Sequence, residues 1–272
     1  LARGNGDAFK AQLQYALEIY DQFDDPAYFR AAMLGGQDKR GWYLNSTRAL
    51  KLLAGNPEDA DLIAGVMAAT SPQNGVDQNL ENTLNFFVNW RAAGRPTEES
   101  EIYRILGASV QGNKGEKSVL DAWKKNTLRV LRREPGAISG QKVDSFYLAL
   151  RERIREMQHG TMTPEQANVL DTWMANYMGV TQPVWARRGS KTKKGLLAGN
   201  PGLSPGYAAG TAALRAGADS IGFNTREAQE TVWSFAYALY NKAEQLKTTA
   251  REVVERGLLT RDDIVGVPDF AL

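Results

Sequence analysis

The chain has 272 residues, of which 43% are hydrophobic and 24% charged, and these proportions are typical of a folded globular protein rather than a disordered one. Cysteine is absent and His159 is the only histidine, which excludes disulfides and cysteine-held zinc and disfavours histidine-rich metal sites and nucleophilic triads. The net charge is only +2, and no apolar run approaches the roughly 18 residues that cross a bilayer, so we expect a soluble, cytoplasmic protein without a membrane partner.

Helical periodicity dominates the chain from its first residues. One apolar helix face is predicted from the spacing of Phe9, Leu13, Ala16, Leu17 and Tyr20. Asn56-Pro57-Glu58 is a favourable helix start, because asparagine caps a helix well and proline fits its first turn. Ser71-Pro72 ends that helix, because the residue before a proline is pushed out of the helical region.

A long helix is predicted over residues 76–93, followed by a break at Gly94-Arg95-Pro96. On this helix the residues that occupy adjoining rows are Leu80, Leu84, Phe87, Val88 and Arg91. Further helices are predicted from Thr97 and over about 117–132, 141–157, 170–178, 204–218 and 225–247. Strand signals are nearly absent. The sequence therefore predicts an all-α protein, a single helical domain over 1–272 with a basic loop at about 180–202.

Basic residues are concentrated in two segments. Residues 114–133 hold seven Lys or Arg against two acids, and residues 187–194 hold five and no acid. The second group consists of Arg187, Arg188, Lys191, Lys193 and Lys194. Such a distribution is typical either of a solvated face or of a face that contacts phosphates, in which case these side chains would position a nucleic acid without reading its sequence. Arg129, Arg132 and Arg133 could extend the same track.

Two further segments carry candidate chemistry. In residues 135–146 a glycine-containing turn with Gly136, Ser139, Gly140 and Gln141 leads into a helix, so backbone N–H groups would point outward together and hold a phosphate oxygen. About thirty residues later, Val169-Leu170 precedes Asp171, whose carboxylate would lie at the positive end of the next helix.

These segments resemble the helix-hairpin-helix DNA glycosylase superfamily. Gly136, Gly140 and Lys142-Val143 match the family's hairpin, and Leu170-Asp171-Thr172 with Gly179 matches its Val-Asp-Thr-His-like motif. The resemblance covers roughly 45 residues, Trp173 stands where the family usually has histidine, and the polar insert 151–166 lengthens the interval between the motifs. It implies a two-lobed helical fold, Asp171 as the carboxylate that supports cleavage of the base–sugar bond, and Lys142 at the position where some members place an amine nucleophile.

Each of these residues also has a structural interpretation. Asp171 could simply cap a helix, and Lys142 could contact a phosphate or lie free on the surface. A target base would need an apolar pocket, for which Trp42, Tyr43 and Trp173 are the aromatic candidates. Ser71, Gln73 and Asn74 could read base edges there or form a hydrogen-bonded turn between helices. Gln229 and Trp233 share a helix face that favours core packing.

A second, vaguer resemblance concerns the origin of the chain. Gly41-Trp42-Tyr43, the segment 68–73 with Asn79, and Glu227 to Trp233 resemble parts of phage-encoded or effector-associated helical proteins. The chain begins Leu1-Ala2-Arg3, and we expect it to be part of a longer polypeptide that acts in, or is delivered to, a cytoplasm.

The leading hypothesis is a DNA base-directed, N-glycosylase-like enzyme that needs neither cofactor nor metal. The alternatives are a nucleobase hypermodification enzyme of the same fold and a non-catalytic nucleic-acid-binding domain.

Overall fold

The protein is described by a computed structural model that covers residues 26–110, 119–134, 138, 140–150, 168–180 and 205–268, with Gln141 and Pro205 described only in their backbone. Every regular element in these ranges is a helix, which confirms the predicted all-α class. The helix predicted around residues 9–20 and most of the basic loop at 180–202 lie outside these residues. The chain divides into two compact units, of which unit 1 comprises 1–41 with 160–267 and unit 2 comprises 42–159 with 268–272.

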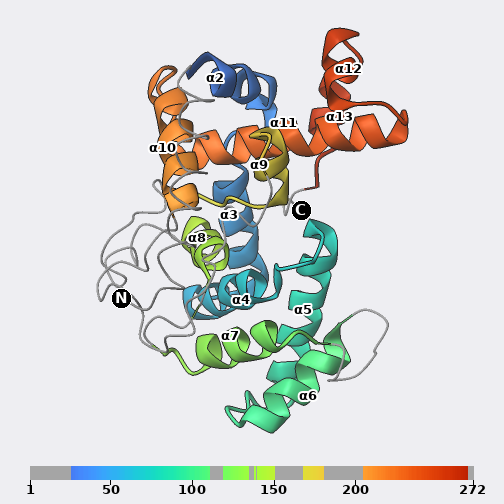
Figure 1. The fold of residues 1–272 in the computed structure, drawn as a ribbon. Coiled ribbons are helices and arrows are strands. Elements are labelled where there is room, and N and C mark those ends of the chain that lie inside the picture. The colour runs from blue at the N-terminus through green and yellow to red at the C-terminus, as the bar shows by residue number, and fades with distance from the viewer. Residues whose placement is uncertain are drawn as a thin grey trace, which may run out of the picture. The chain divides into compact units, whose positions relative to one another are not determined.

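Unit 1 is built around the long helix α11 (Thr225–Gln245), which contacts every other helix of the unit (Figure 1). These other helices are α2 (Pro26–Gly35), the short 3-10 helix η1 (Gln37–Lys39), α9 (Thr172–Tyr177), α10 (Pro205–Asp219), α12 (Ala250–Glu255) and α13 (Arg261–Val265). The core between them contains fully buried Phe29, Met33, Met174, Leu214 and Val232.

Two glycines allow helices of unit 1 to approach closely. A Cβ atom on Gly36 would lie 2.0 Å from the carbonyl oxygen of Thr231, and one on Gly217 would lie 2.7 Å from the Cβ of Phe29. Both distances are below any real Cβ contact. The absence of a side chain at these positions therefore lets α2 and the following turn pack directly on α10 and α11.

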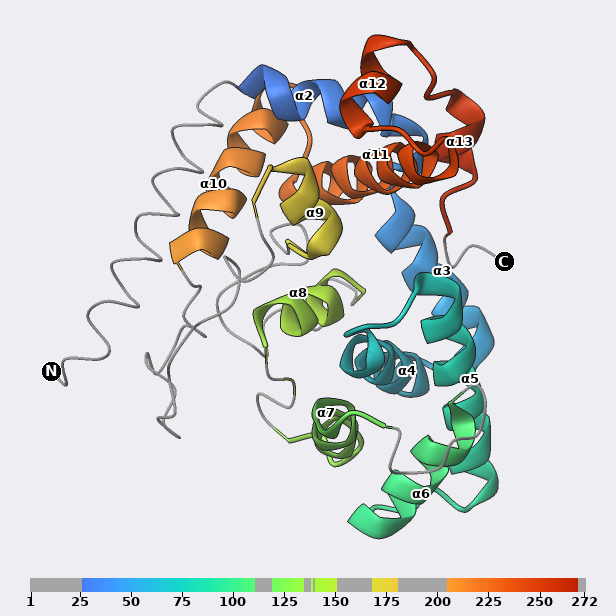
Figure 2. The same cartoon turned by 45° about the vertical axis from the view of Figure 1, so that its right-hand side comes forward.

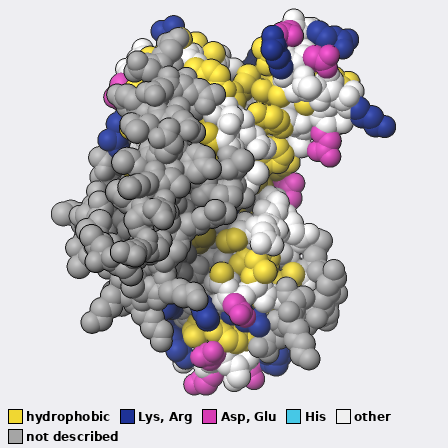
Figure 3. All heavy atoms as spheres, viewed as in Figure 1, with side chains coloured by type: hydrophobic (Ala, Val, Ile, Leu, Met, Phe, Trp, Pro, Cys, Tyr) yellow, Lys and Arg dark blue, Asp and Glu magenta, His cyan; other side chains and the backbone are white. Residues whose placement is uncertain are grey.

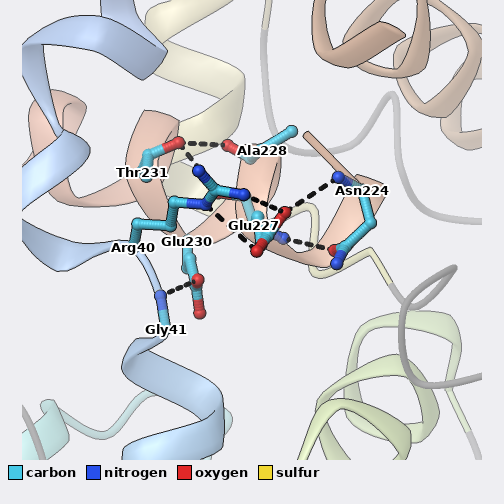
Figure 4. Close-up of polar contacts among 7 residues, drawn as sticks. All are labelled: Arg40, Gly41, Asn224, Glu227, Ala228, Glu230 and Thr231. Atoms are coloured by element: carbon cyan, nitrogen blue, oxygen red, sulfur yellow. Dashed lines mark hydrogen bonds and ion pairs between the residues drawn. The ribbon is translucent and has the colours of Figure 1, made fainter. Parts of the chain in front are cut away.

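The start of α11 is joined to the segment that follows η1 by a group of polar contacts (Figure 4). Asn224 and Glu227 form a capping box, and Arg40 donates two hydrogen bonds to the Glu227 carboxylate at 3.0 and 3.2 Å. The next peptide also takes part, because the Gly41 N–H donates to the buried carboxylate of Glu230. Residues far apart in sequence thus fix the backbone up to Gly41, the last residue of this unit before unit 2 begins.

Unit 2 is built around α4 (Pro57–Thr70), as Figure 2 shows. It is packed against α3 (Trp42–Ala54), α5 (Val76–Ala92), α7 (Asp121–Leu131) and α8 (Gln141–Ala149), and α6 (Glu99–Ser109) packs on α5 and α7. Every residue of α4 from Leu62 to Thr70 is buried. A helix that is apolar on all sides belongs in the centre of a helical layer, and α4 occupies that position.

Local signals in the sequence set several of the helix ends. The Asn56 side chain accepts a hydrogen bond from the Asp59 N–H at 2.8 Å, and α4 ends at Thr70, one residue before Ser71-Pro72, as predicted. The helices α2, α3, α12 and α13 were not predicted. In α3 the polar residues Ser46 and Thr47 obscure the periodicity, yet both hydroxyls donate to carbonyls four residues earlier, at 2.7 and 2.9 Å. No helix in the described part of the chain is long and apolar enough to cross a membrane.

Candidate functional site

The segment before Asp171 has no regular secondary structure and is held by side chains of α10 and α11. The hydroxyl of Tyr207 donates to the carbonyl of Asn168 and accepts the N–H of Leu170 at 3.1 Å, while the Gln229 amide donates to the Val169 carbonyl at 3.1 Å. All of these side chains are buried. Helices α10 and α11 together therefore fix the point at which the chain enters α9.

Asp171 is the N-cap of α9, and its carboxylate accepts hydrogen bonds from two backbone N–H groups and from an indole. Oδ1 accepts the N–H groups of Trp173 and Met174 at 3.0 and 3.2 Å, and Oδ2 accepts the indole N–H of Trp233 at 3.0 Å. The side chain is partly exposed. This geometry confirms that Asp171 begins a helix, and it places a fixed negative charge where the first peptide N–H groups stabilise it.

The indole that contacts this carboxylate belongs to a group of packed aromatic rings in unit 1. Trp173 contacts Tyr237 edge to face, with 5.0 Å between ring centres, and Trp233 stacks on Tyr237 at 5.1 Å. The centre of the Tyr240 ring lies 6.4 Å from that of the Trp173 ring. All four rings are partly buried, and Figure 3 shows apolar side chains at the surface over α11 beside α9. Asp171 is thus bonded, through Trp233, to a group of aromatic side chains that present part of their area to solvent.

Tyrosine hydroxyls hold the other end of α9. Tyr240 donates to the carbonyl of Asn176 at 2.7 Å, Tyr28 donates to that of Tyr177, and Tyr177 donates in return to that of Tyr28 at 3.0 Å. Burial raises the pKa of Tyr28 to about 12 and also raises the pKa values of Tyr177 and Tyr240. The three phenols are therefore neutral donors near neutral pH. Tyr28 and Tyr240 hold the last two carbonyls of a helix only six residues long, and Tyr177 ties the same helix back to α2.

Of the predicted aromatic pocket, the structure brings Asp171 and Trp173 together. Trp42 and Tyr43 belong to unit 2, where they are 7% and 3% exposed and contact each other edge to face at 4.7 Å. The Trp42 indole donates to the Pro268 carbonyl at 3.3 Å, and the Tyr43 ring lies 6.1 Å from that of Phe146. Both are core residues of unit 2 in this structure, so they offer little surface to a ligand.

The polar residues between α4 and α5 form a hydrogen-bonded turn. Ser71 donates to the Ala68 carbonyl at 2.9 Å, and the Asn74 amide makes long contacts of 3.4 Å with the Thr70 carbonyl and Asn79 Oδ1. Gln73 is exposed, with a φ of +60°. These contacts agree with the structural interpretation of Ser71 and Asn74. Gln73 is the most exposed of the three, and Asn74 is partly exposed.

The predicted phosphate-binding hairpin is described in part. Gly136 and Ser139 lie outside the described residues, whereas Gly140 is the N-cap of α8 with a φ of 102°, a conformation that favours glycine. Gln141 begins the helix and Lys142 lies in its first turn, partly exposed. Both α7 and α8 pack against α4. The predicted glycine-to-helix transition is therefore present at Gly140, in unit 2.

The arginines at the end of α7 and directly after it are engaged with neighbouring groups. Arg133 pairs with Glu58 at 3.0 Å, Arg129 lies 3.8 Å from Glu134, and Arg132 donates to the Thr97 carbonyl. Figure 3 accordingly shows basic and acidic side chains intermixed over α6 and α7. These contacts favour a solvated, ion-paired face over a continuous phosphate track. The other predicted basic group, 187–194, lies outside the described residues.

The aromatic partners of Asp171 on α11 are the site residues that sequence analysis missed. Trp233, Tyr237 and Tyr240 recur at helical spacing, but that pattern is equally typical of core packing, and the sequence analysis favours core packing for Trp233.

Within the described ranges, no cluster of three or more His, Asp or Glu side chains could hold a metal ion.

Comparisons with models of protein families, with curated proteins and with solved structures gave no match.

Proposed function

We propose that the protein is a DNA base-directed enzyme of N-glycosylase-like type, in which Asp171 acts on the bond between base and sugar. The observation that carries the proposal is a carboxylate held by two backbone N–H groups and the Trp233 indole, beside the partly exposed rings of Trp173, Tyr237 and Tyr240. The resemblance of the Leu170-Asp171-Thr172 segment to the glycosylase motif supports the same assignment.

This arrangement suits the chemistry of base removal. The bond between C1′ and the base nitrogen breaks with its electron pair leaving on the base, which takes up a proton, and a water oxygen then bonds to C1′ and releases its proton. The sugar passes through an oxocarbenium-like state, which a fixed anion stabilises. The carboxylate can also take the proton of the water. A base out of its stack needs an apolar or aromatic face, and Trp173 with the tyrosines offers one.

The hairpin contributes binding in the same proposal. The N–H groups at the start of α8 after Gly140, together with Lys142, would contact phosphate oxygens, and residues 187–194 would add charge that holds the DNA backbone. The role of Lys142 as an amine nucleophile stays a prediction.

One observation favours the non-catalytic alternative. The hydrogen bonds that Asp171 accepts from the α9 backbone and from Trp233 are those that a helix cap and a tryptophan need for structure alone. A domain that only binds nucleic acid through the aromatic faces and the hairpin would keep the same contacts.

Base release and base alteration can be measured on the same reactions. Single- and double-stranded oligonucleotides carrying ordinary and damaged bases are incubated with the protein, then treated with alkali, which cuts at abasic sites, while mass spectrometry of the nucleosides detects altered bases. We expect alkali-labile sites with at least one substrate. Asp171→Asn should lower their rate at least about 100-fold.

The matched control is Asp219→Asn, which removes an exposed carboxylate from α10 of the same unit and should leave the rate unchanged. Altered bases without abasic sites would show nucleobase modification instead. DNA that is bound but recovered intact from every reaction would leave only the binding function and overturn the enzyme proposal.

A further inference from the structure

A cavity of about 380 Å³ opens on the surface of unit 2, and none of its lining residues is assigned to base chemistry. Its walls come from three helices: Leu53 of α3, Ile63 of α4, and Leu84, Phe87, Val88 and Arg91 of α5. The four α5 residues have i, i+3, i+4, i+7 spacing and belong to the adjoining rows that the sequence predicts on this helix.

The residues at the bottom of this cavity are buried, whereas those at its mouth are exposed. Ile63 and Phe87, 1% and 4% exposed, belong to the core of the unit, whereas Leu53 and Val88 are 43% and 64% exposed. Water-exposed aliphatic side chains next to an apolar cavity favour occupation by an apolar group, because both then lose contact with water.

Among the described residues that line the cavity, Arg91 is the one with a charge. Its guanidinium lies 5.6 Å from the centre of the Phe87 ring, an arrangement that holds the cation over the aromatic face. Within the described residues Arg91 forms no ion pair with a carboxylate, unlike Arg95 and Arg133 of the same unit, which pair with Asp59 and Glu58. A cation at an apolar cavity without an acid beside it is complementary to an anion that carries an apolar chain.

We propose that this cavity binds a small amphipathic carboxylate of the medium-chain fatty acid type, with the chain against Leu53, Ile63, Leu84 and Phe87 and the carboxylate at Arg91. The cavity lies at the lower end of the roughly 300–1,000 Å³ range of small-molecule sites, which suits a single unbranched chain rather than a larger ring system. This inference is independent of the proposed base chemistry, which rests on residues of unit 1 and on the start of α8.

The proposal makes the affinity depend on both ends of the ligand. Calorimetric titration with hexanoate, octanoate and decanoate, each below its micelle concentration, should show affinity rising about threefold to fourfold for each added methylene. Decyltrimethylammonium, with the same chain and the opposite charge, should bind at least about tenfold more weakly than decanoate.

Two substitutions distinguish binding in the cavity from binding elsewhere on the protein surface. Arg91→Gln should lower the affinity for decanoate about tenfold. Val88→Asp should abolish decanoate binding, because it places a second negative charge at the mouth of the cavity. Because both residues are exposed, the variants should keep the wild-type circular dichroism and melting temperature. Lys125→Gln, which removes an exposed cation from α7, is the matched control and should bind decanoate like the wild type.

Failure of decanoate to bind the folded wild type would overturn the proposal. So would equal affinity in Arg91→Gln, Val88→Asp and the control, because the ligand would then lie elsewhere. If sedimentation instead shows a dimer that Val88→Asp separates into monomers, the cavity is filled by a second copy of the chain and the fatty-acid assignment is wrong.

Discussion

At the scale of single residues, Asp171 couples the start of α9 to α11 through one carboxylate. Asp171→Ala removes the N-cap and leaves the Trp233 indole without this acceptor, so we expect the free energy of unfolding to fall by about 2 kcal/mol. Denaturation in urea measures this loss. Asp171→Asn keeps a capping oxygen but turns an amide N–H₂ group either towards the indole or towards the backbone donors.

A double-mutant cycle tests that interpretation of the Asn variant. Trp233→Phe removes the indole donor, so Asp171→Asn should cost less stability in the Trp233→Phe background than in the wild type. Equal costs in the two backgrounds would mean that the carboxylate and the indole are not coupled in solution.

The same residue shows what a sequence can predict about a site. The helix start at Asp171 follows from its immediate neighbours, because capping is a local interaction. The indole donor is 62 residues away in sequence, and no local pattern distinguishes it from a core tryptophan. Trp42 and Tyr43 show that residue type alone does not distinguish a binding pocket from a core. Their aromatic rings suggested a base pocket, but they pack in the core of unit 2.

At the scale of helices, the start of α8 depends on the backbone of Gly140. Its φ of 102° and ψ of 126° strain any residue with a side chain, although the nearest atom to an added Cβ, on Val143, is 3.9 Å away. Gly140→Ala should therefore cost about 2 kcal/mol through strain rather than collision. Gly75→Ala, at the start of α5 with a φ of −69° and open space around it, should cost less than about 1 kcal/mol in the same thermal or urea unfolding.

A lysine in the first turn of the same helix gives a measurement on binding. If Lys142 contacts a phosphate, Lys142→Gln should weaken the binding of DNA to the same extent for every sequence. It should also reduce the slope of log affinity against log salt concentration by about 1. Unchanged affinity and slope would remove Lys142 from the DNA interface.

The tyrosines that hold the end of α9 make unit 1 sensitive to high pH. The pKa of Tyr28 is raised from 10.0 to about 12, so folding favours the neutral phenol. Its contribution to stability is complete below pH 10 and is lost as the pH rises towards 12, because the unfolded chain then releases the proton more readily. Unfolding free energies measured from pH 8 to 12 should fall more steeply in the wild type than in Tyr28→Phe, and parallel curves would contradict this role.

Helix prediction succeeded where the signals were local and failed where they were not. The start of α4 and the helices α5, α10 and α11 follow from caps, breakers and periodicity. The short helices α12 and α13 are only six and five residues long and are stabilised by packing on α11, so propensity in their own sequences is too weak to reveal them. In α4 the buried residues lie on every face of the helix, and this apolar composition predicts its central position in the unit.

At the scale of the whole molecule, the chain contains two cores. Unit 1 buries Phe29, Met33 and Val232, and unit 2 buries Ile63, Phe86 and Leu106, with the chain passing between the units at residues 41/42, 159/160 and 267/268. Sequence periodicity does not reveal this division, because every segment obeys the same helical pattern while the partition depends on which helices contact one another.

Separate cores predict separate losses of stability. Phe86→Ala should destabilise unit 2 by about 3–5 kcal/mol and Met33→Ala should destabilise unit 1 by about 2–5 kcal/mol, because each leaves a cavity in a fully buried site. Hydrogen exchange followed by mass spectrometry resolves the two units as different peptides. We expect Phe86→Ala to accelerate exchange in α4 and α5 while α10 and α11 keep their protection, and Met33→Ala to do the reverse. Equal acceleration of all four helices in either variant would show that the two cores unfold as one cooperative structure.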